Sequence, residues 1–214
     1  GEAVGVDLPA GDWVAAAAGA AERVKAIVVG PGLGAAAAGG SGAGAETAVG
    51  RLLASTGAPA VVDADAITAL GSVDAVAAVS RRRAGAVVLT PHQGEYAKLT
   101  GAGPGDDVIA DVRAVARQTG AVLLLKGPTT VVAAPDGRVL IAAAGRTNLA
   151  TAGTGDTLAG IIAAFLARGV EPLRAAALAA HVHGRAAARG HREGLLASDL
   201  PLLVADFLSS TEER

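Results

Sequence analysis

The chain has 214 residues, of which 51% are hydrophobic and only 2% aromatic, and its formal net charge is −2. This length fits one domain over residues 1–214, with a core of Val, Leu, Ile and close-packed Ala. The small net charge, without a Lys/Arg run among aromatic residues, argues against a nucleic-acid partner. The sequence has no cysteine for disulfides or thiolate metal sites and no stretch that reads as a membrane span. We therefore expect a soluble, cytoplasmic protein.

Short β-branched runs alternate along the chain with longer Ala-rich stretches of helical period. This alternation predicts an α/β fold, a three-layer α/β/α sandwich in which helices cover both faces of a mostly parallel sheet. The predicted buried strands are Ala26–Val29, Ala60–Val62, Ala86–Leu89 and Val122–Leu125. Each is followed within two residues by Gly, Asp or Pro. Ligand sites in such sheets lie at the carboxyl ends of the strands.

A hairpin is predicted from Thr130–Ala134 and Arg138–Ala142, which flank the turn tripeptide Pro135–Gly137. Helices are predicted over stretches that mostly have Asp, Ser or Pro near the start. Their ranges are Ala43–Ser55, Ser72–Arg83, Asp106–Gln118, Asp156–Arg168, Leu173–Arg189 and Ser198–Leu208.

The strongest chemical pattern is Gly153-Thr154-Gly155-Asp156, where small residues lead directly into an apolar helix. Unpaired amides at a helix N-terminus, open to close approach because Gly has no side chain, suit a phosphoryl group. Asp156 could then act as a general base beside that phosphate. An isolated G-x-G-D is more often a Gly-rich turn with an N-cap aspartate, so this pattern needs support from its context.

Lys126-Gly127-Pro128-Thr129-Thr130 follows a predicted strand and brings an ammonium and two hydroxyls to the same sheet edge. These groups could hold a nucleotide phosphate. An ordinary strand-to-hairpin corner explains the segment equally well when it is taken alone.

Two further strand ends carry polar side chains. Thr90–Glu95 brings His92 and Glu95 to the edge, where they could position a substrate and, through Glu95, a metal-bound water. A lone His-x-x-Glu is more often a surface turn. After another strand, one of Asp63 and Asp65 could cap the following helix while the other faces a ligand.

Gly30–Ala35 follows a strand and resembles the dinucleotide-binding pattern G-x-G-x-x-A. The Gly-rich residues after it do not give a firm helix for a pyrophosphate, and no acidic residue ends a strand at the usual distance. We therefore interpret it as a loop that approaches a bound substrate closely. His181 and His183 lie two apart on a predicted helix and point to different faces, which argues against a shared metal.

In chain order these motifs resemble the NAD(P)H-hydrate dehydratase family across nearly the whole chain. The residues that carry the resemblance are Val29–Gly34, Val62–Ala66, Leu89–Glu95, Leu125–Gly127 with Thr130, and Ala152–Asp156. The resemblance implies a ribokinase-like fold and repair of the hydrated (6S) forms of NADH and NADPH, with ADP as co-substrate in bacteria and ATP in eukaryotes. It implies phosphorylation of the substrate hydroxyl followed by loss of phosphate.

The resemblance also implies roles for individual residues. Those implied to contact the substrate are Gly32, Gly34, His92 and Asp156, the last as the catalytic residue. Those implied to bind the adenine nucleotide are Lys126, Gly127, Pro128, Thr129, Thr130 and Gly155. Further candidates are Asp63, Asp65, Glu95, Asn148, Gly153 and Thr154, with Glu95 reaching Mg²⁺ through a water. A homo-oligomer is expected.

Two features depart from the family pattern. Gln93 stands where the family usually has Pro, which loosens the loop after His92. Family members also carry an amino-terminal segment that contacts substrate, and this chain starts after it and without Met, so we expect part of the substrate site to be absent and an epimerase domain could precede the chain. The Ala-, Arg- and Gly-rich composition is typical of a GC-rich bacterial genome, which favours ADP.

Two other functions fit the same motifs. A ribokinase-like kinase of the hydroxymethylpyrimidine or hydroxyethylthiazole type would stop after phosphoryl transfer, whereas His92-x-x-Glu95 and Gly30-Pro31-Gly32 favour the dehydratase. A nucleotide-binding module without catalysis is the other alternative. Product analysis separates these alternatives, because only the dehydratase restores the absorbance of the reduced nicotinamide.

Overall fold

The computed structural model describes residues 5–9, 13–35, 38 and 43–212, and in this part of the chain the strands form one six-stranded sheet. The strands lie in the order β1-β2-β3-β4-β5-β6, with β1 to β4 parallel and β5 and β6 antiparallel. Their bounds are Ile27–Val29 (β1), Ala60–Val62 (β2), Val87–Leu89 (β3), Val122–Leu125 (β4), Thr130–Ala133 (β5) and Val139–Ala142 (β6). The predicted parallel strands and hairpin are confirmed.

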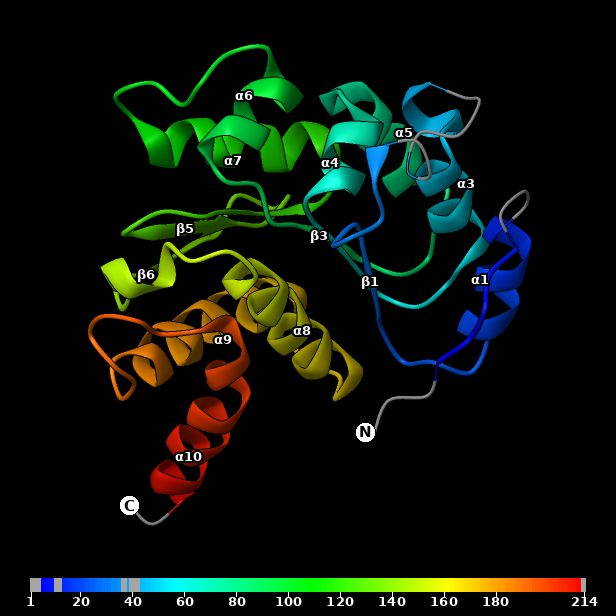
Figure 1. The fold of residues 1–214 in the computed structure, drawn as a ribbon. Helices are drawn as coiled ribbons and strands as arrows, with labels where there is room; N and C mark the ends of the chain where they lie inside the picture. The colour runs from blue at the N-terminus through cyan, green and yellow to red at the C-terminus, as the bar shows by residue number, and fades with distance from the viewer. Residues whose placement is uncertain (1–4, 10–12, 36–37, 39–42, 213–214) are drawn as a thin grey trace.

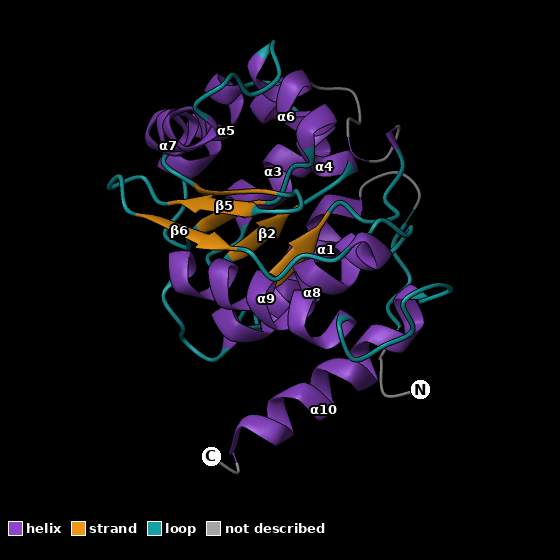
Figure 2. Ribbon diagram, turned by 90° about the vertical axis from the view of Figure 1, so that its left-hand side faces the viewer, coloured by secondary structure: helices purple, strands orange, loops and turns teal. Residues whose placement is uncertain are grey.

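Helices cover both faces of this sheet, which gives the predicted three layers (Figures 1 and 2). One layer contains Ala48–Ser55 (α3), Asp65–Leu70 (α4), Val73–Arg81 (α5), Gln93–Thr100 (α6) and Val108–Thr119 (α7). The other contains Thr154–Ala167 (α8) and Pro172–Ala187 (α9), with Leu200–Glu212 (α10) packed outside α9. Trp13–Ala21 (α1) packs against α3.

Strands β2, β3 and β4 are buried on both faces, and alternate side chains enter different layers. Val62, Leu89 and Leu123 belong to the core beneath α3 to α7. Val61 and Val88 belong to the core that α8 and α9 cover. The β-branched and leucine runs of the sequence therefore build two cores, one on each side of the sheet.

The predicted helices are present, although their ends differ from the predicted ones. Thr47 divides the first range: it caps α3 by accepting a hydrogen bond from the Gly50 amide, with the short turn Gly44–Glu46 before it. Helix α8 begins at Thr154, two residues before the predicted start at Asp156. Helices α1, α4 and α6 were not predicted, because α4 and α6 are short and their N-caps, Ala64 and His92, are not among the usual capping residues.

The polar residues that follow the parallel strands lie at one edge of the sheet, the carboxyl edge. The β-ladder continues past the strand ends, since the Asp63 amide donates to the Val29 carbonyl and the Thr90 amide to the Val62 carbonyl. The Lys126 amide likewise donates to the Pro91 carbonyl at 2.8 Å. The residues after β2, β3 and β4 are thus held side by side.

None of the helices in the described ranges is both long and apolar enough to cross a membrane.

Candidate active site at the carboxyl edge of the sheet

Lys126 lies between two carboxylates at the carboxyl edge. Its Nζ is 2.8 Å from Asp63 Oδ1 and 3.6 Å from Glu95 Oε2. The Asp63 side chain is 2% exposed, that of Glu95 11% and that of Lys126 21%, so this ion cluster is largely shielded from water. Charges removed from water in this way persist only when they are paired, and such clusters occur often at functional sites.

His92 and Glu95 form a capping box at the start of α6. His92 Nδ1 accepts hydrogen bonds from the Gly94 and Glu95 amides, and Glu95 Oε2 accepts one from the His92 amide at 2.8 Å. The alternative interpretation of this segment as a surface turn is therefore wrong, because it is a helix start with a buried carboxylate. His92 Nε2, on a side chain 59% exposed, lies 3.5 Å from Glu95 Oε1. Gln93 is the first residue of α6, a position at which Pro is also well tolerated.

The Gly-rich pattern forms the N-terminus of α8, as predicted. Gly153 is the N-cap, with φ +87° and no side chain to cap the helix. The amides of Gly155 and Asp156 donate to no acceptor in the described part of the chain. A Cβ at Gly155 would lie 3.7 Å from both Asp63 Oδ2 and Lys126 Nζ, so the open amides border the ion cluster. We call Gly153–Asp156 the cradle.

Asp156 lies in the first turn of α8 rather than at its N-cap. Its side chain is exposed, and within the described ranges it forms no hydrogen bond or ion pair. The N-cap interpretation of this aspartate is therefore wrong, because Gly153 occupies that position. Its negative charge is favourable at the positive end of the helix dipole.

Neither Asp63 nor Asp65 caps α4, contrary to one of the sequence interpretations. Asp63 is bound to Lys126, and Asp65 Oδ2 accepts a hydrogen bond from the Gly34 amide at 2.8 Å. Ala64 between them is the N-cap of α4 and has φ +48°, a conformation that sequence reasoning did not anticipate. The sequence does not indicate the positive φ of Ala64, because non-glycine residues rarely adopt a positive φ.

The remaining candidates lie in two loops. Gly127, Pro128 and Thr129 are exposed after β4, and Thr130 begins β5. Asn148 is fixed at the end of α9: its Nδ2 donates to the carbonyl of Ala187, the last residue of the helix, and to that of His191 after it, both 3.1 Å away. Its Oδ1 is buried and has no hydrogen-bond partner in the described residues.

His183 is a buried residue that the sequence interpretation did not include in the site. It lies on α9 in contact with the Thr154 backbone, behind the cradle, and its Nε2 has no hydrogen-bond partner among the described residues. Burial lowers the pKa of the imidazole to about 4, and the contact with the Thr154 backbone acts in the opposite direction. His181, in contrast, is exposed, so the two histidines do face different ways. No cluster of potential metal ligands occurs in the described ranges.

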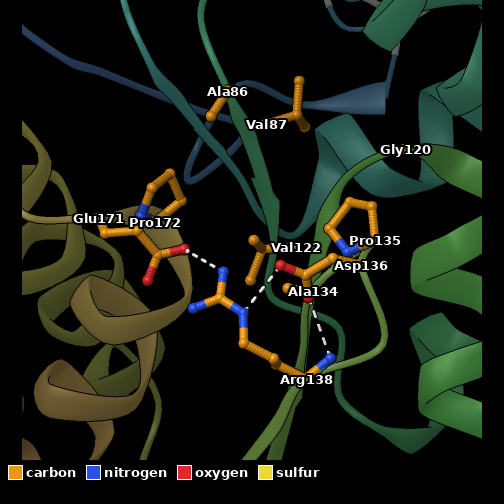
Figure 3. Close-up of a pocket in the computed structure, with 10 residues that line it drawn as sticks. All are labelled: Ala86, Val87, Gly120, Val122, Ala134, Pro135, Asp136, Arg138, Glu171 and Pro172. Atoms are coloured by element: carbon orange, nitrogen blue, oxygen red, sulfur yellow. Dashed lines mark hydrogen bonds and ion pairs between the residues drawn. The ribbon is translucent and has the colours of Figure 1, made fainter.

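The hollow shown in Figure 3 lies at the other end of the sheet. It has a volume of about 250 Å³ and is lined by the first residues of β3 and β4 and the β5–β6 turn. Arg138 crosses it, with its guanidinium 2.8 Å from Asp136 and 3.2 Å from Glu171 (Figure 3). The positive charge of Arg138 is already paired with these two carboxylates. The carboxyl edge of the sheet is therefore the better candidate for the active site.

A mostly parallel sheet with an antiparallel edge hairpin, helices on both faces and a glycine cradle at the carboxyl edge defines a ribokinase-like protein. The family model for NAD(P)H-hydrate dehydratase matches residues 6–209. The chain belongs to this family, which confirms the resemblance recognised in its motifs.

Individual relatives agree with the family model. The chain is 40% identical to an ADP-dependent (S)-NAD(P)H-hydrate dehydratase of Neisseria meningitidis over 84% of its own length and 61% of that protein. It is 40% identical to a bifunctional NAD(P)H-hydrate repair enzyme of Moorella thermoacetica over 90% of its length. It spans about a third of the bifunctional relatives it matches (36% of the Moorella protein).

A solved structure shares the fold over most of the chain. The ADP/ATP-dependent NAD(P)H-hydrate dehydratase of Bacillus subtilis, co-crystallised with ATP and Mg²⁺, matches with a TM-score of 0.72 and 28% sequence identity. The match covers 93% of this chain and 70% of the Bacillus chain.

Proposed function

We propose that residues 1–214 act as one domain that dehydrates (6S)-NADHX and (6S)-NADPHX to NADH and NADPH, with ADP or ATP as co-substrate. One observation carries the proposal: in a chain of the dehydratase family, the buried Lys126 cluster borders the open amides at the start of α8. Together they offer a positive charge and unpaired donors to a phosphoryl group.

In this proposal the adenine nucleotide binds between the cradle and the loop Lys126–Thr130. The Gly155 and Asp156 amides are the donors at the phosphate, because they have no acceptor in the described part of the protein. Asp63 keeps the Lys126 ammonium beside Gly155. A phosphate that enters here meets more carboxylates than ammonium groups, so a cation must accompany it.

The residues present suit Mg²⁺ that arrives with the nucleotide. Protein sites usually hold Mg²⁺ through one or two carboxylates together with substrate phosphates, and Glu95 is the carboxylate we assign to it, through a water. When bound, the ion neutralises charge on the transferred phosphoryl group.

Asp156 is the proposed general base. Its exposed, unpaired carboxylate takes the proton of the substrate hydroxyl while that oxygen forms a bond to the terminal phosphorus of the nucleotide. The bond from this phosphorus to the bridging oxygen breaks, so that AMP leaves when the donor is ADP and ADP leaves when the donor is ATP. The phosphorylated intermediate then loses inorganic phosphate together with a proton from the neighbouring carbon, which restores the double bond.

The substrate is proposed to lie against Gly32, Gly34 and His92. Both glycines are exposed and have positive φ, which leaves their backbone open to close approach. The exposed His92 Nε2 faces away from the amides that its Nδ1 caps. In this proposal Nδ1 caps α6 and Nε2 contacts the ligand.

The test is an assay of hydrated NADH with ADP or ATP and Mg²⁺. The proposal predicts that the absorbance of reduced nicotinamide returns and that one phosphate appears for each molecule restored. A flat signal with a phosphorylated product would instead identify a ribokinase-like kinase. Nucleotide binding, measured as a rise in melting temperature, without any turnover would identify a binding module.

Three properties of the whole protein are also proposals. The name of the Moorella relative, a bifunctional repair enzyme, supports an epimerase domain upstream of these residues in a longer protein. A homo-oligomer and a cytoplasmic location are the other two. Size-exclusion chromatography with light scattering, and fractionation of cells that express the protein, test them.

A further inference from the structure

Asp63 and Asp65, which are separated by one residue, serve different parts of the site. The Asp63 carboxylate is buried against Lys126, whereas Asp65 Oδ2 accepts the Gly34 amide 2.8 Å away. Ala64 between them has φ +48° and ψ −122°, a backbone conformation unfavourable for a residue with a Cβ. This bend allows the two carboxylates to reach different loops.

The loop Gly30–Gly34, which Asp65 contacts, depends on contacts with other segments to keep one conformation. Gly30, Gly32 and Gly34 all have positive φ, and glycine loses more backbone freedom on ordering than any other residue. Gly30 packs so closely on the Asp63 carbonyl that a Cβ there would overlap it. Leu33 is partly buried against the core, and its amide donates to the Gly30 carbonyl at 3.1 Å.

Gly34 lies beyond these anchors and is exposed, and its carbonyl accepts a hydrogen bond from the amide of the buried Ala38 at 3.0 Å. The bond to Asp65 is the side-chain contact that fixes its amide in the described structure. Asp65 is the first residue of α4, whose own N-cap forms no side-chain bond, so its carboxylate serves the loop rather than the helix. A hydrogen bond to an ionised group is stronger than one between neutral groups.

We infer that Asp65 is a positioning residue that holds Gly34, and through it Gly32, in the conformation that receives the substrate. The inference rests on the proposed function for the identity of that substrate. Without the carboxylate acceptor the glycine loop samples many conformations, and binding must select the competent one, which lowers apparent affinity. The nucleotide subsite, built from Lys126 and the cradle, does not depend on this bond.

The experiment compares Asp65→Ala and Asp65→Asn in the intact protein. Amide hydrogen exchange of the peptide that covers Gly30–Gly34 reports the order of the loop, and KM and kcat for hydrated NADH report its use. Asp65→Ala should speed exchange in that peptide by about tenfold or more, because the bond to a charged acceptor is lost. It should raise KM by a similar factor and change kcat by less than about threefold. Asp65→Asn retains an acceptor and should recover most of both effects.

Asp111→Ala is the matched control. Asp111 Oδ2 accepts the Gly105 amide at 2.7 Å, the same kind of bond in a glycine loop outside the proposed site. This variant should speed exchange around Gly105 but leave KM unchanged. Calorimetric ADP affinity should stay within about twofold of wild type in all three variants.

The outcomes separate this inference from the proposed function. If the wild-type protein does not turn over hydrated NADH, the proposed function fails, while the exchange measurement still decides whether Asp65 orders the loop. Unchanged exchange and KM in Asp65→Ala would overturn the inference, and so would Asp65→Asn behaving like Asp65→Ala. If Asp65→Ala does not fold, Asp65→Ser, with too short a side chain to reach Gly34, takes its place in the same comparison.

Discussion

The two ends of the sheet each carry a three-residue ion cluster, and they differ in burial. At the amino end, Arg138, Asp136 and Glu171 are 54%, 53% and 39% exposed around the hollow of Figure 3. At the carboxyl edge, Lys126, Asp63 and Glu95 are 21%, 2% and 11% exposed. The exposed cluster clamps the hairpin turn to α9, whereas the shielded one adjoins open helix amides. The hollow at the amino end therefore does not mark the better candidate site.

Because the two clusters differ in burial, their ion pairs contribute differently to the stability of the fold. Exposed ion pairs contribute little to stability, because water screens them and long side chains lose freedom. A buried pair is costly to desolvate and costly to break, and apolar residues often replace it without loss of stability. Its presence at the carboxyl edge is therefore better explained by function than by stability.

The largest expected effect concerns Asp156. Asp156→Asn should lower kcat by about 10²- to 10⁴-fold, the usual contribution of a general base, because Asn cannot take the hydroxyl proton. The cradle amides are untouched, so nucleotide affinity measured by calorimetry should remain near the wild-type value.

Asp74→Asn is the control for that variant. Asp74 is also an exposed carboxylate in the first turn of a helix, α5, and its replacement should leave kcat unchanged. Near wild-type kcat in Asp156→Asn would remove this residue from the catalytic step.

The next effect compares the clusters directly through stability. Lys126→Met leaves two buried carboxylates without their cation and should lower the free energy of unfolding by about 3 to 5 kcal/mol. Arg138→Met, in the exposed cluster, should cause no measurable change. Urea denaturation of both variants at neutral pH gives the comparison, and equal losses would contradict the distinction drawn from burial.

A third effect depends on pH and concerns His183 behind the cradle. Its pKa is about 4 in the folded protein and near 6.5 when unfolded, so below pH 6.5 the unfolded chain binds a proton that the native protein does not. The titration of His183 thus does not change the free energy of unfolding above pH 6.5, and it lowers that free energy as the pH drops from 6.5 to 4. This group should account for about 3 kcal/mol of that loss.

His183→Gln should remove that share of the acid sensitivity, measured as unfolding free energy along the pH series. His181→Gln, at an exposed position on the same helix, should retain the wild-type pH dependence. A His183→Gln profile parallel to that of the wild type would show that the imidazole is not buried in its neutral form.

The smallest effect concerns the strained residue between the two aspartates. Ala64→Gly should raise the free energy of unfolding by about 1 kcal/mol, because glycine adopts φ +48° without the clash of a Cβ. Ala69→Gly, in the ordinary helical geometry of α4, should lower it by about 1 kcal/mol. Thermal unfolding measures both variants, and a change of the same sign in both would argue against strain at Ala64.

Much of the fold could be predicted from local patterns. Strands β2, β3 and β4 are short β-branched or leucine runs followed within two residues by Gly, Asp or Pro, and burial on both faces keeps them uniformly apolar. The β5–β6 turn followed from Pro135 and Gly137, and Gly137 has the positive φ that the turn requires. Helix α6 was missed because a histidine with its partner Glu95, rather than Ser, Thr or Asp, caps it.

The candidate site was predictable only as a set of strand ends. The parallel topology brings Asp63, Glu95 and Lys126 together, but which carboxylate pairs with the lysine depends on three-dimensional packing. The bend at Ala64 and the burial of His183 have no local sequence signal. Ala64 lies between two aspartates that bind residues distant in the sequence, Lys126 and Gly34, and His183 contacts the backbone at the start of α8.

The most direct test of the central claim is amide hydrogen exchange of the wild-type protein with and without ADP and Mg²⁺. The claim is that the nucleotide binds at the carboxyl edge and not in the hollow. We predict slower exchange in peptides that cover Lys126–Thr130 and Gly153–Asp156, and no change in the turn Ala134–Arg138. Protection of Ala134–Arg138, with the cradle unchanged, would contradict the account.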